Sequence, residues 1–245
     1  MNECKVTAEE RYLFDLNGFL VFRRLLSPDQ VSALNNAINR NHPVRPAGPL
    51  KTQFFDDFML WHEGFRDLLT HPRVYPLLCE WVDQRLRLDQ YYGIQMAPGT
   101  FGAKLHGGAQ DLDDHSEYFM VHDGRISTGI TTVQWALSEM LPGQGGLACI
   151  PGSHKSSFAR PHGYDHTARP VIQIPLEPGD AVLFTGALAH CTLPWQGPHE
   201  RRAVLFKYAP RNIAWSDSYQ RWPDELRKHL GPELQPLLRP PGGAD

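Results

Sequence analysis

The sequence predicts a mainly β fold with flanking helices, and three observations support this prediction. Apolar runs of strand length recur between residues 86 and 208. Turns rich in glycine and proline separate them, and the chain holds 21 residues of each type. Helical patterns are confined to the first third and to the C-terminal end. Many short strands joined by such turns are typical of a sandwich or a jelly roll that closes at one end around a ligand.

The helical patterns lie mainly in the first eighty residues. Thr7 to Glu10 fits a capping box that opens a short helix, and Ser27 with Pro28 marks the start of a second one. A strand is expected between them, at residues 18–22. Residues 65–69 and 74–82 also have helical spacing. We expect these leading helices to cover one sheet.

Strands dominate the rest of the chain. The runs are residues 86–96, 101–105, 128–137, 147–150, 171–174, 181–185 and 201–208. A helical tail is expected at 216–245, broken by Pro223 and Pro232. No linker or repeat divides the sequence, so we expect a single domain over residues 1–245 with its core at about 7–215.

Composition excludes several classes of function. A net charge of −3 does not suit a nucleic-acid surface or an anionic membrane surface, and no apolar run reaches the roughly 18 residues of a membrane span. The N-terminal residues lack the apolar segment of a signal peptide. The four cysteines show no CxxC pairing, which is typical of reduced thiols. We expect a cytoplasmic protein whose partner is a small molecule.

Two histidines and an arginine stand beside predicted strands. His106 follows the run 101–105, and His190 follows the apolar stretch that begins at residue 182. Arg201 opens the next strand, eleven positions after His190. Imidazole is a good ligand for iron, and the planar fork of arginine matches a carboxylate bidentately. The pattern predicts an iron site that binds a dicarboxylate.

The parts of the sequence that carry a family resemblance are Leu105-His106, the motifs at 142–147 (PGQGGL) and 150–155 (IPGSHK), and the group His190-Cys191-Thr192 with Arg201. With these parts the sequence resembles the phytanoyl-CoA dioxygenase family of non-haem iron, 2-oxoglutarate-dependent oxygenases. The resemblance covers residues 7–215. It implies a double-stranded β-helix (jelly roll, cupin-like) and the cofactors Fe(II), 2-oxoglutarate and O2. It also implies that His106 and His190, each at the end of a strand, hold the metal, and that Arg201 and Thr192 hold the distal carboxylate of 2-oxoglutarate.

Three further residues are candidates for the cosubstrate pocket or its neighbourhood. Gln134 lies on an expected inner strand and would line the pocket, whereas the adjacent Trp135 is expected in the core. Lys104 shares a strand face with His106 and would counter a carboxylate. Arg202 points to the face opposite Arg201, because side chains alternate along a strand, so only Arg201 is expected to reach the cosubstrate.

The metal motif departs from the family at Gly108. The family places a carboxylate two residues after the first histidine, where strand alternation brings both side chains to one face. Glycine offers no ligand there. The first hypothesis is that a halide ion fills the open position, as the resemblance to radical halogenases implies, so that the enzyme chlorinates an unactivated C–H bond.

Two alternatives remain open. A nearby acid supplies the carboxylate and the enzyme is a hydroxylase; the candidates are Asp111, Asp113, Asp114 and Glu117. In the second alternative the chain is a metal-free, cupin-like binding module. The segment 110–125 is expected to form a substrate lid. His154 and Lys155 of the IPGSHK stretch are expected in a structural turn rather than on the metal. The sequence carries no signal of substrate identity, site selectivity or oligomeric state.

Overall fold

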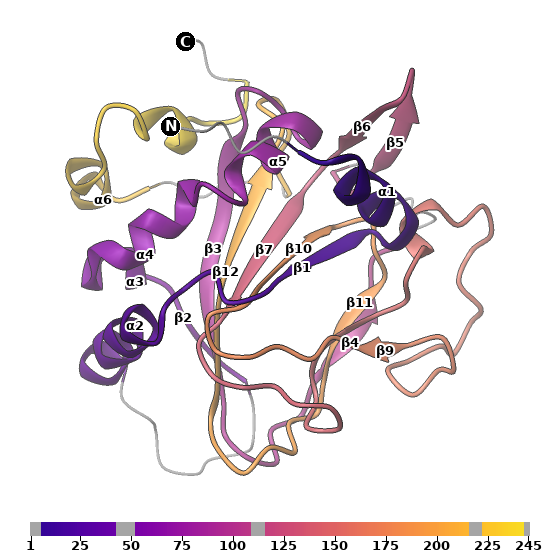
Figure 1. Ribbon diagram of the computed structural model, residues 1–245, viewed down its shortest axis with the longest axis horizontal. Helices are drawn as coiled ribbons and strands as arrows, with labels where there is room; N and C mark the ends of the chain where they lie inside the picture. Colours follow the sequence, from indigo (N-terminus) through magenta and orange to yellow (C-terminus); the bar gives the residue numbers. More distant parts are fainter. Residues whose placement is uncertain (1–5, 43–51, 109–115, 216–221, 243–245) are drawn as a thin grey trace.

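The structure, a computed structural model, describes residues 6–42, 52–108, 116–215 and 222–242. Two antiparallel sheets face each other, and helices lie along the far side of the larger one (Figure 1). The larger sheet has the strand order β1-β10-β7-β12-β3-β2, and the smaller sheet has the order β4-β11-β8-β9. A hairpin, β5-β6, projects from one end. The predicted fold class is confirmed.

The strands of the larger sheet are β1 (Phe19–Phe22), β2 (Gln53–Phe55), β3 (Arg87–Met96), β7 (Thr131–Ala136), β10 (Ala181–Thr185) and β12 (Arg201–Ala209). Those of the smaller sheet are β4 (Ala103–His106), β8 (Gly146–Cys149), β9 (Ile172–Gln173) and β11 (His190–Leu193). The hairpin consists of β5 (Phe119–His122) and β6 (Arg125–Thr128).

Capping boxes fix the starts of the first two helices. In α1 (Ala8–Asn17) the Thr7 hydroxyl accepts from the Glu10 backbone, and the Glu10 side chain accepts from the Thr7 backbone. Ser27 and Gln30 do the same for α2 (Pro28–Asn41). The other helical elements are α3 (Phe58–Trp61), α4 (Glu63–Asp67), η1 (Leu68–Thr70), α5 (Tyr75–Trp81), η2 (Ser153–Lys155), α6 (Asp224–His229) and η3 (Gln235–Leu238).

Strand β12 divides the interior into two cores. Val204 and Phe206 pack on the helix side, whereas Ala203 and Leu205 pack into the space between the sheets. Successive strand residues point to opposite faces, so this strand is buried on both sides. The inter-sheet face is also the one on which Arg201 lies. The fold therefore aims one arginine of the Arg201-Arg202 pair into the space between the sheets.

The structure corrects four expectations. The run 128–137 is not one strand, because β6 ends at Thr128 and β7 begins at Thr131. Gly129 lies between the two strands. A Cβ atom at this position would lie 2.0 Å from the Ser116 carbonyl oxygen, so the backbone of residue 116 comes too close for any residue but glycine. His190 begins β11 instead of ending the preceding strand, because β10 stops at Thr185 and a turn intervenes. Strand β2 was not predicted.

The fourth correction concerns the form of the segment 110–125, which was expected as a loop; its expected role as a substrate lid stays a prediction. Its second half is the regular hairpin β5-β6, which explains its apolar and β-branched content. Residues 109–115, with Asp111, Asp113 and Asp114, lie outside the described residues. So do 216–221 of the expected tail, whose described part contains α6 and η3. In the part of the chain described, no helix is both long enough and apolar enough to cross a membrane.

Candidate active site

His106 and His190 are brought together by the pairing of β4 with β11. The two residues are direct cross-strand partners. Their ring centroids lie 4.2 Å apart, with an angle of 53° between the planes. The sequence separates them by more than eighty residues, so it is the antiparallel register that creates the pair. Two imidazoles at this separation can bind one ion from adjacent coordination positions.

Backbone carbonyls fix the tautomer of both rings. The Nδ1 of His106 lies 2.8 Å from the Lys104 carbonyl, and that of His190 lies 2.7 Å from the Leu188 carbonyl. A carbonyl only accepts, so each Nδ1 must carry the proton and donate it. Each Nε2 then keeps its lone pair. Metal-binding histidines are typically oriented by this type of Nδ1 hydrogen bond.

The surroundings of His190 favour its neutral ring. Burial, followed by repulsion from His106, lowers the pKa of His190 to about 3. A neutral imidazole is the form that binds a metal ion, so the protein presents His190 ready to ligate at neutral pH. The Phe184 ring packs edge-on against His190 with centroids 4.9 Å apart. This contact limits rotation of the ring.

Arg201 lies at the start of β12, fully buried between the sheets. Its Nε and Nη1 donate to the sulfur atoms of Met140 and Met96, both at 3.0 Å. Thioether sulfur is a weak acceptor, and Nη2 has no hydrogen-bond partner within the described ranges. Burial lowers the pKa of Arg201 to about 10. A buried guanidinium with such weak partners is suited to an anionic ligand.

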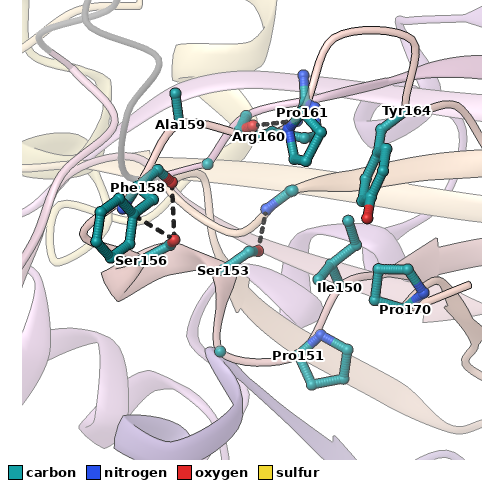
Figure 2. Close-up of a pocket in the computed structure, with 14 residues that line it drawn as sticks. Ile150, Pro151, Ser153, Ser156, Phe158, Ala159, Arg160, Pro161, Tyr164 and Pro170 are labelled. Carbon is teal, nitrogen blue, oxygen red and sulfur yellow. Dashed lines mark hydrogen bonds between the residues drawn. The ribbon is translucent and has the colours of Figure 1, made fainter. Parts of the chain in front are cut away.

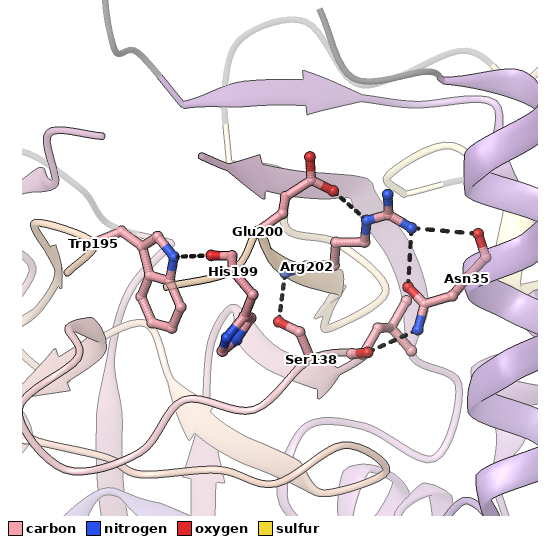
Figure 3. A network of polar contacts seen from close by, with 7 residues as sticks. Asn35, Ser138, Trp195, His199, Glu200 and Arg202 are labelled. Carbon is pink, nitrogen blue, oxygen red and sulfur yellow. Dashed lines mark hydrogen bonds and ion pairs between the residues drawn. The ribbon is translucent and has the colours of Figure 1, made fainter. Parts of the chain in front are cut away.

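Arg202 lies on the opposite face, as strand alternation predicts. It pairs with Glu200 and with the side-chain oxygen of Asn35 on α2, and its backbone N–H donates to Ser138 (Figure 3). These contacts tie the start of β12 to the helix layer. Arg202 is therefore already occupied by protein groups, whereas Arg201 is not.

Gln134 and Thr192 share the space between the sheets with Arg201. The cross-strand neighbours of Gln134 are Val182 and Leu205, and its Nε2 is buried without a partner in the described structure. Thr192 lies two residues beyond His190 on β11 and therefore on the same face. Trp135 packs on the helix side, as expected. Lys104 is exposed, and the contact it makes to His106 runs through its carbonyl oxygen.

Gly107 and Gly108, the next two residues, differ in the space around them. A Cβ atom at Gly107 would lie 2.8 Å from the carbonyls of both Gly186 and Leu188. At Gly108 the nearest atoms would be the Ala189 Cβ at 3.8 Å and the Arg160 Nη1 at 3.9 Å. Gly107 is thus required by close packing. Position 108 has open space around its Cβ position, but its φ of +120° is a conformation that favours glycine.

Within the described part of the chain, no third ligand stands with the two histidines. Among the described residues, no group of three histidine, cysteine, aspartate or glutamate side chains is arranged to hold a metal ion. Of the acids considered above, Glu117 is described: its carboxyl group lies 3.0 Å from the Cβ position of Gly186. Gly186 adjoins Gly107 through its carbonyl. Glu117 therefore lies against Gly186, whose carbonyl faces Gly107, and it forms no three-residue metal group with the two histidines among the described residues.

A cavity of about 660 Å³ opens beside Gly107 and Gly108 (Figure 2). Its other walls come from the IPGSHK stretch and from the segment that follows it. The lining residues are Ile150, Pro151, Gly152, Ser153, Ser156, Phe158, Ala159, Arg160, Pro161, Tyr164, Pro170 and Ala189. This volume suits an organic molecule of moderate size. Two of its lining residues, Gly107 and Ala189, are the chain neighbours of His106 and His190, and neither histidine itself lines the cavity.

Comparison with known proteins assigns the family. The family model for phytanoyl-CoA dioxygenase (PhyH) matches residues 14–203, well over half of the chain. The chain belongs to the phytanoyl-CoA dioxygenase family. The family is one of Fe(II)/2-oxoglutarate-dependent oxygenases, so the resemblance inferred from the motifs is confirmed.

Individual relatives of the chain carry dioxygenase names. Dioxygenase trt7 of Aspergillus terreus is 24% identical over 241 residues, which cover 91% of this chain and 80% of that protein. Dioxygenase cdmD of Talaromyces verruculosus is 30% identical over 103 residues, which cover 42% of this chain and 33% of that protein.

Among solved structures, HygX from Streptomyces hygroscopicus with nickel and 2-oxoglutarate bound is similar, with a TM-score of 0.76 and 25% identity over 86% of this chain and 90% of that one. A further HygX structure contains hygromycin B as well, with a TM-score of 0.75, 25% identity and the same coverage. The carbocyclase SnoK shares the fold, with a TM-score of 0.63, 18% identity and coverage of 93% and 92%. The fold of the PhyH domain is thus the double-stranded β-helix.

In this PhyH domain, sequence reasoning missed the residues that contact Arg201 and Gly107. The methionines that contact Arg201 stand on β3 and in the turn before β8, and no local pattern marks them. Arg160 was also missed: its Nη1 donates to the Gly107 carbonyl at 2.7 Å across 53 residues of sequence. These contacts arise where loops meet strands, so a spacing pattern cannot reveal them.

Proposed function

We propose that this protein uses Fe(II), 2-oxoglutarate and O2 to functionalise an unactivated C–H bond of a small molecule, and that the product is chlorinated. The observation that carries the proposal is the open position at Gly108 beside two correctly oriented histidines. A carboxylate and a halide compete for one coordination position. Because glycine leaves that position free, chloride has room beside the metal.

The residues present fit the cofactors. The Nε2 atoms of His106 and His190 would hold iron, and Arg201 would bind the distal carboxylate of 2-oxoglutarate with support from Thr192 and Gln134. Bound iron, with 2-oxoglutarate and O2, supplies an oxidant able to remove hydrogen from an unactivated C–H bond. The unpaired Nη2 of Arg201 supports the assignment, because binding a carboxylate would satisfy a buried donor that is otherwise unpaired.

The protein's own contribution is positioning. The carbonyls of Lys104 and Leu188 orient the two imidazoles, and the packed inter-sheet space excludes water from the cosubstrate end. The overall reaction consumes one C–H bond, one chloride, one proton, one O2 and one 2-oxoglutarate. It yields one C–Cl bond, succinate, CO2 and water. The substrate would enter through the cavity beside Gly108.

The decisive test is chloride binding. Purified protein should bind iron stoichiometrically and develop a weak visible band on anaerobic addition of 2-oxoglutarate, which a metal-free binding module would not do. Chloride should shift this band in the wild type, and the shift should be absent in Gly108→Asp because a carboxylate fills the position. With the substrate in hand, product mass spectra should show the chlorine isotope pattern. Only hydroxylated product in saturating chloride would refute chlorination.

Hydroxylation is the second candidate, and the position of Glu117 favours it. Its carboxyl group packs against Gly186, the residue whose carbonyl contacts Gly107. If a movement of Glu117 completes the ligand set, Glu117→Gln should abolish iron-dependent succinate formation, and chloride should have no effect on the visible band. If the product is chlorinated, Glu117→Gln should retain turnover, and only chloride should perturb the band.

A further inference from the structure

Arg160 occupies a position that the proposed reaction does not use. It lies on the segment after the IPGSHK stretch and lines the cavity (Figure 2). Its Nη1 donates to the Gly107 carbonyl at 2.7 Å and lies 3.9 Å from the Cβ position of Gly108. Arg160 is an exposed residue, and its guanidinium is held at the part of the cavity wall that Gly107 and Gly108 form, the two residues that follow His106 in the chain.

The charge of the lining is one-sided. Among the described residues that form the cavity wall, Arg160 carries the only charge, and no aspartate or glutamate is present. A guanidinium has five N–H donors in a fixed fork. The structure gives Arg160 one hydrogen bond in the described part of the chain, to Gly107, which leaves donors to face a ligand.

The two serine hydroxyls of the cavity wall are already engaged with the backbone. The Ser153 hydroxyl accepts from the Ala189 N–H at 2.8 Å, and the Ser156 hydroxyl donates to the Phe158 carbonyl at 2.8 Å. The rest of the wall is mainly proline, aromatic and aliphatic, including Phe158, which is 85% exposed. Such a wall suits the apolar body of a ligand, with Arg160 as its charged anchor and the Tyr164 hydroxyl as a further polar group.

From this arrangement we infer that the substrate is an organic acid: an apolar, ring-containing molecule whose carboxylate is bound by Arg160. The inference rests on the proposed function in taking this cavity as the substrate site, but it does not depend on whether the product is chlorinated or hydroxylated. Anchoring the acid on Arg160 would hold it at the part of the cavity wall formed by Gly107 and Gly108, which directly follow His106 in the chain. A cationic substrate would meet the guanidinium with like charge.

Three matched probes test the inference: 2-naphthoate, 2-naphthamide and 2-naphthylmethylammonium. They share one apolar body and differ in charge. Each is titrated calorimetrically, without oxygen, into protein loaded with Fe(II) and 2-oxoglutarate. We expect 2-naphthoate to bind at least about tenfold more tightly than 2-naphthamide, the range for a hydrogen bond to a charged group at a partly exposed site. The ammonium probe should bind most weakly.

Variants of Arg160 separate recognition from structure. Arg160→Met should remove the preference for 2-naphthoate and leave the affinity for 2-naphthamide unchanged. Arg160→Lys should retain part of the preference because it keeps the charge. Arg169→Met is the control, since it removes an exposed arginine from the same segment but not from the cavity wall; it should change none of the affinities. The visible band of the iron complex reports separately whether the metal and cosubstrate sites remain intact.

Several results would overturn the inference. Equal affinities for 2-naphthoate and 2-naphthamide in the wild type would do so, as would undetectable binding of 2-naphthoate or tightest binding of the ammonium probe. An equal loss of both affinities in Arg160→Met would show that Arg160 only supports the Gly107 backbone. If Arg160→Met weakens chloride binding while the naphthyl probes bind alike throughout, the arginine serves a halide and not a substrate. A failed chlorination test leaves the probe affinities untouched.

Discussion

The cosubstrate end and the substrate end of the site are built differently. Arg201 and Gln134 are 0% and 1% exposed, and both stand on central strands whose neighbours fix their register. Phe158 and Arg160 stand on a connecting segment at the surface, and Phe158 is 85% exposed. Under the proposed assignment, the cosubstrate residues are built into the sheets, whereas substrate choice is left to a loop segment that can vary without disturbing the hydrogen bonds between strands.

Substitutions at the two ends should therefore differ in how strongly they affect the enzyme. A side chain between the sheets cannot move without disturbing the packing on both sides, and a buried donor left unpaired has no water to compensate it. A loop side chain has water as an alternative partner. We expect substitutions at the cosubstrate end to affect every turnover, and substitutions at the substrate end to change affinity for particular molecules.

The largest effect is expected at the histidine pair. His106→Ala or His190→Ala should reduce iron-dependent succinate formation to the level without iron, because the described site has only these two imidazole ligands. Bound iron, measured after desalting, should fall in parallel. His166→Ala, an exposed histidine outside the cavity wall, is the control. Undiminished succinate formation in either ligand variant would show that the metal is bound elsewhere.

The next effect distinguishes two adjacent arginines. Arg201→Ala should raise the KM for 2-oxoglutarate steeply, since losing one member of a buried, hydrogen-bonded charge pair costs about 2–5 kcal/mol. Arg202→Ala should leave that KM nearly unchanged and instead lower the melting temperature, because it breaks the link from β12 to Glu200 and Asn35. An exchange of these two outcomes would mean that the other face of β12 binds the cosubstrate.

The smallest effect is expected for the pH dependence of stability and concerns His154, in the turn of the IPGSHK stretch. His154, 1% exposed, donates from Nε2 to the Asp15 carbonyl on α1 at 3.0 Å, and burial lowers its pKa to about 4. The folded-state pKa lies below the unfolded value of 6.5, so the unfolded chain binds the proton first as pH falls. Stability should therefore be lost between about pH 6.5 and pH 4, by about 2 kcal/mol at pH 5.

The comparison to make is urea unfolding at pH 7 and pH 5 for the wild type and for His154→Gln. The variant lacks the titrating group, so its stability should fall by about 2 kcal/mol less than that of the wild type over this interval. Parallel losses in the two proteins would show that His154 does not couple folding to pH. Succinate formation at pH 7 should be similar in both, since His154 lies outside the proposed metal set.

Much of the fold and of the chemical end of the site was determined by local sequence. Thr7 with Glu10 fixes the start of α1, because a capping box needs only the hydrogen bonds of one turn. Strand alternation placed Arg201 and Arg202 on opposite faces without any knowledge of the fold. The family motifs identified the histidines, since short-range spacing sets which side chains share a strand face.

Tertiary structure alone decided the remainder. His190 begins a strand because its pairing with His106 starts there, and that register depends on a distant chain segment. Residues 128–137 are divided by the close contact of Gly129 with Ser116, and Arg160 meets Gly107 across a loop. Nothing in the local sequence specifies these contacts, because each depends on how separately formed segments pack against one another. The walls of the proposed substrate cavity consist of such contacts, so the sequence predicted the reaction class better than the substrate.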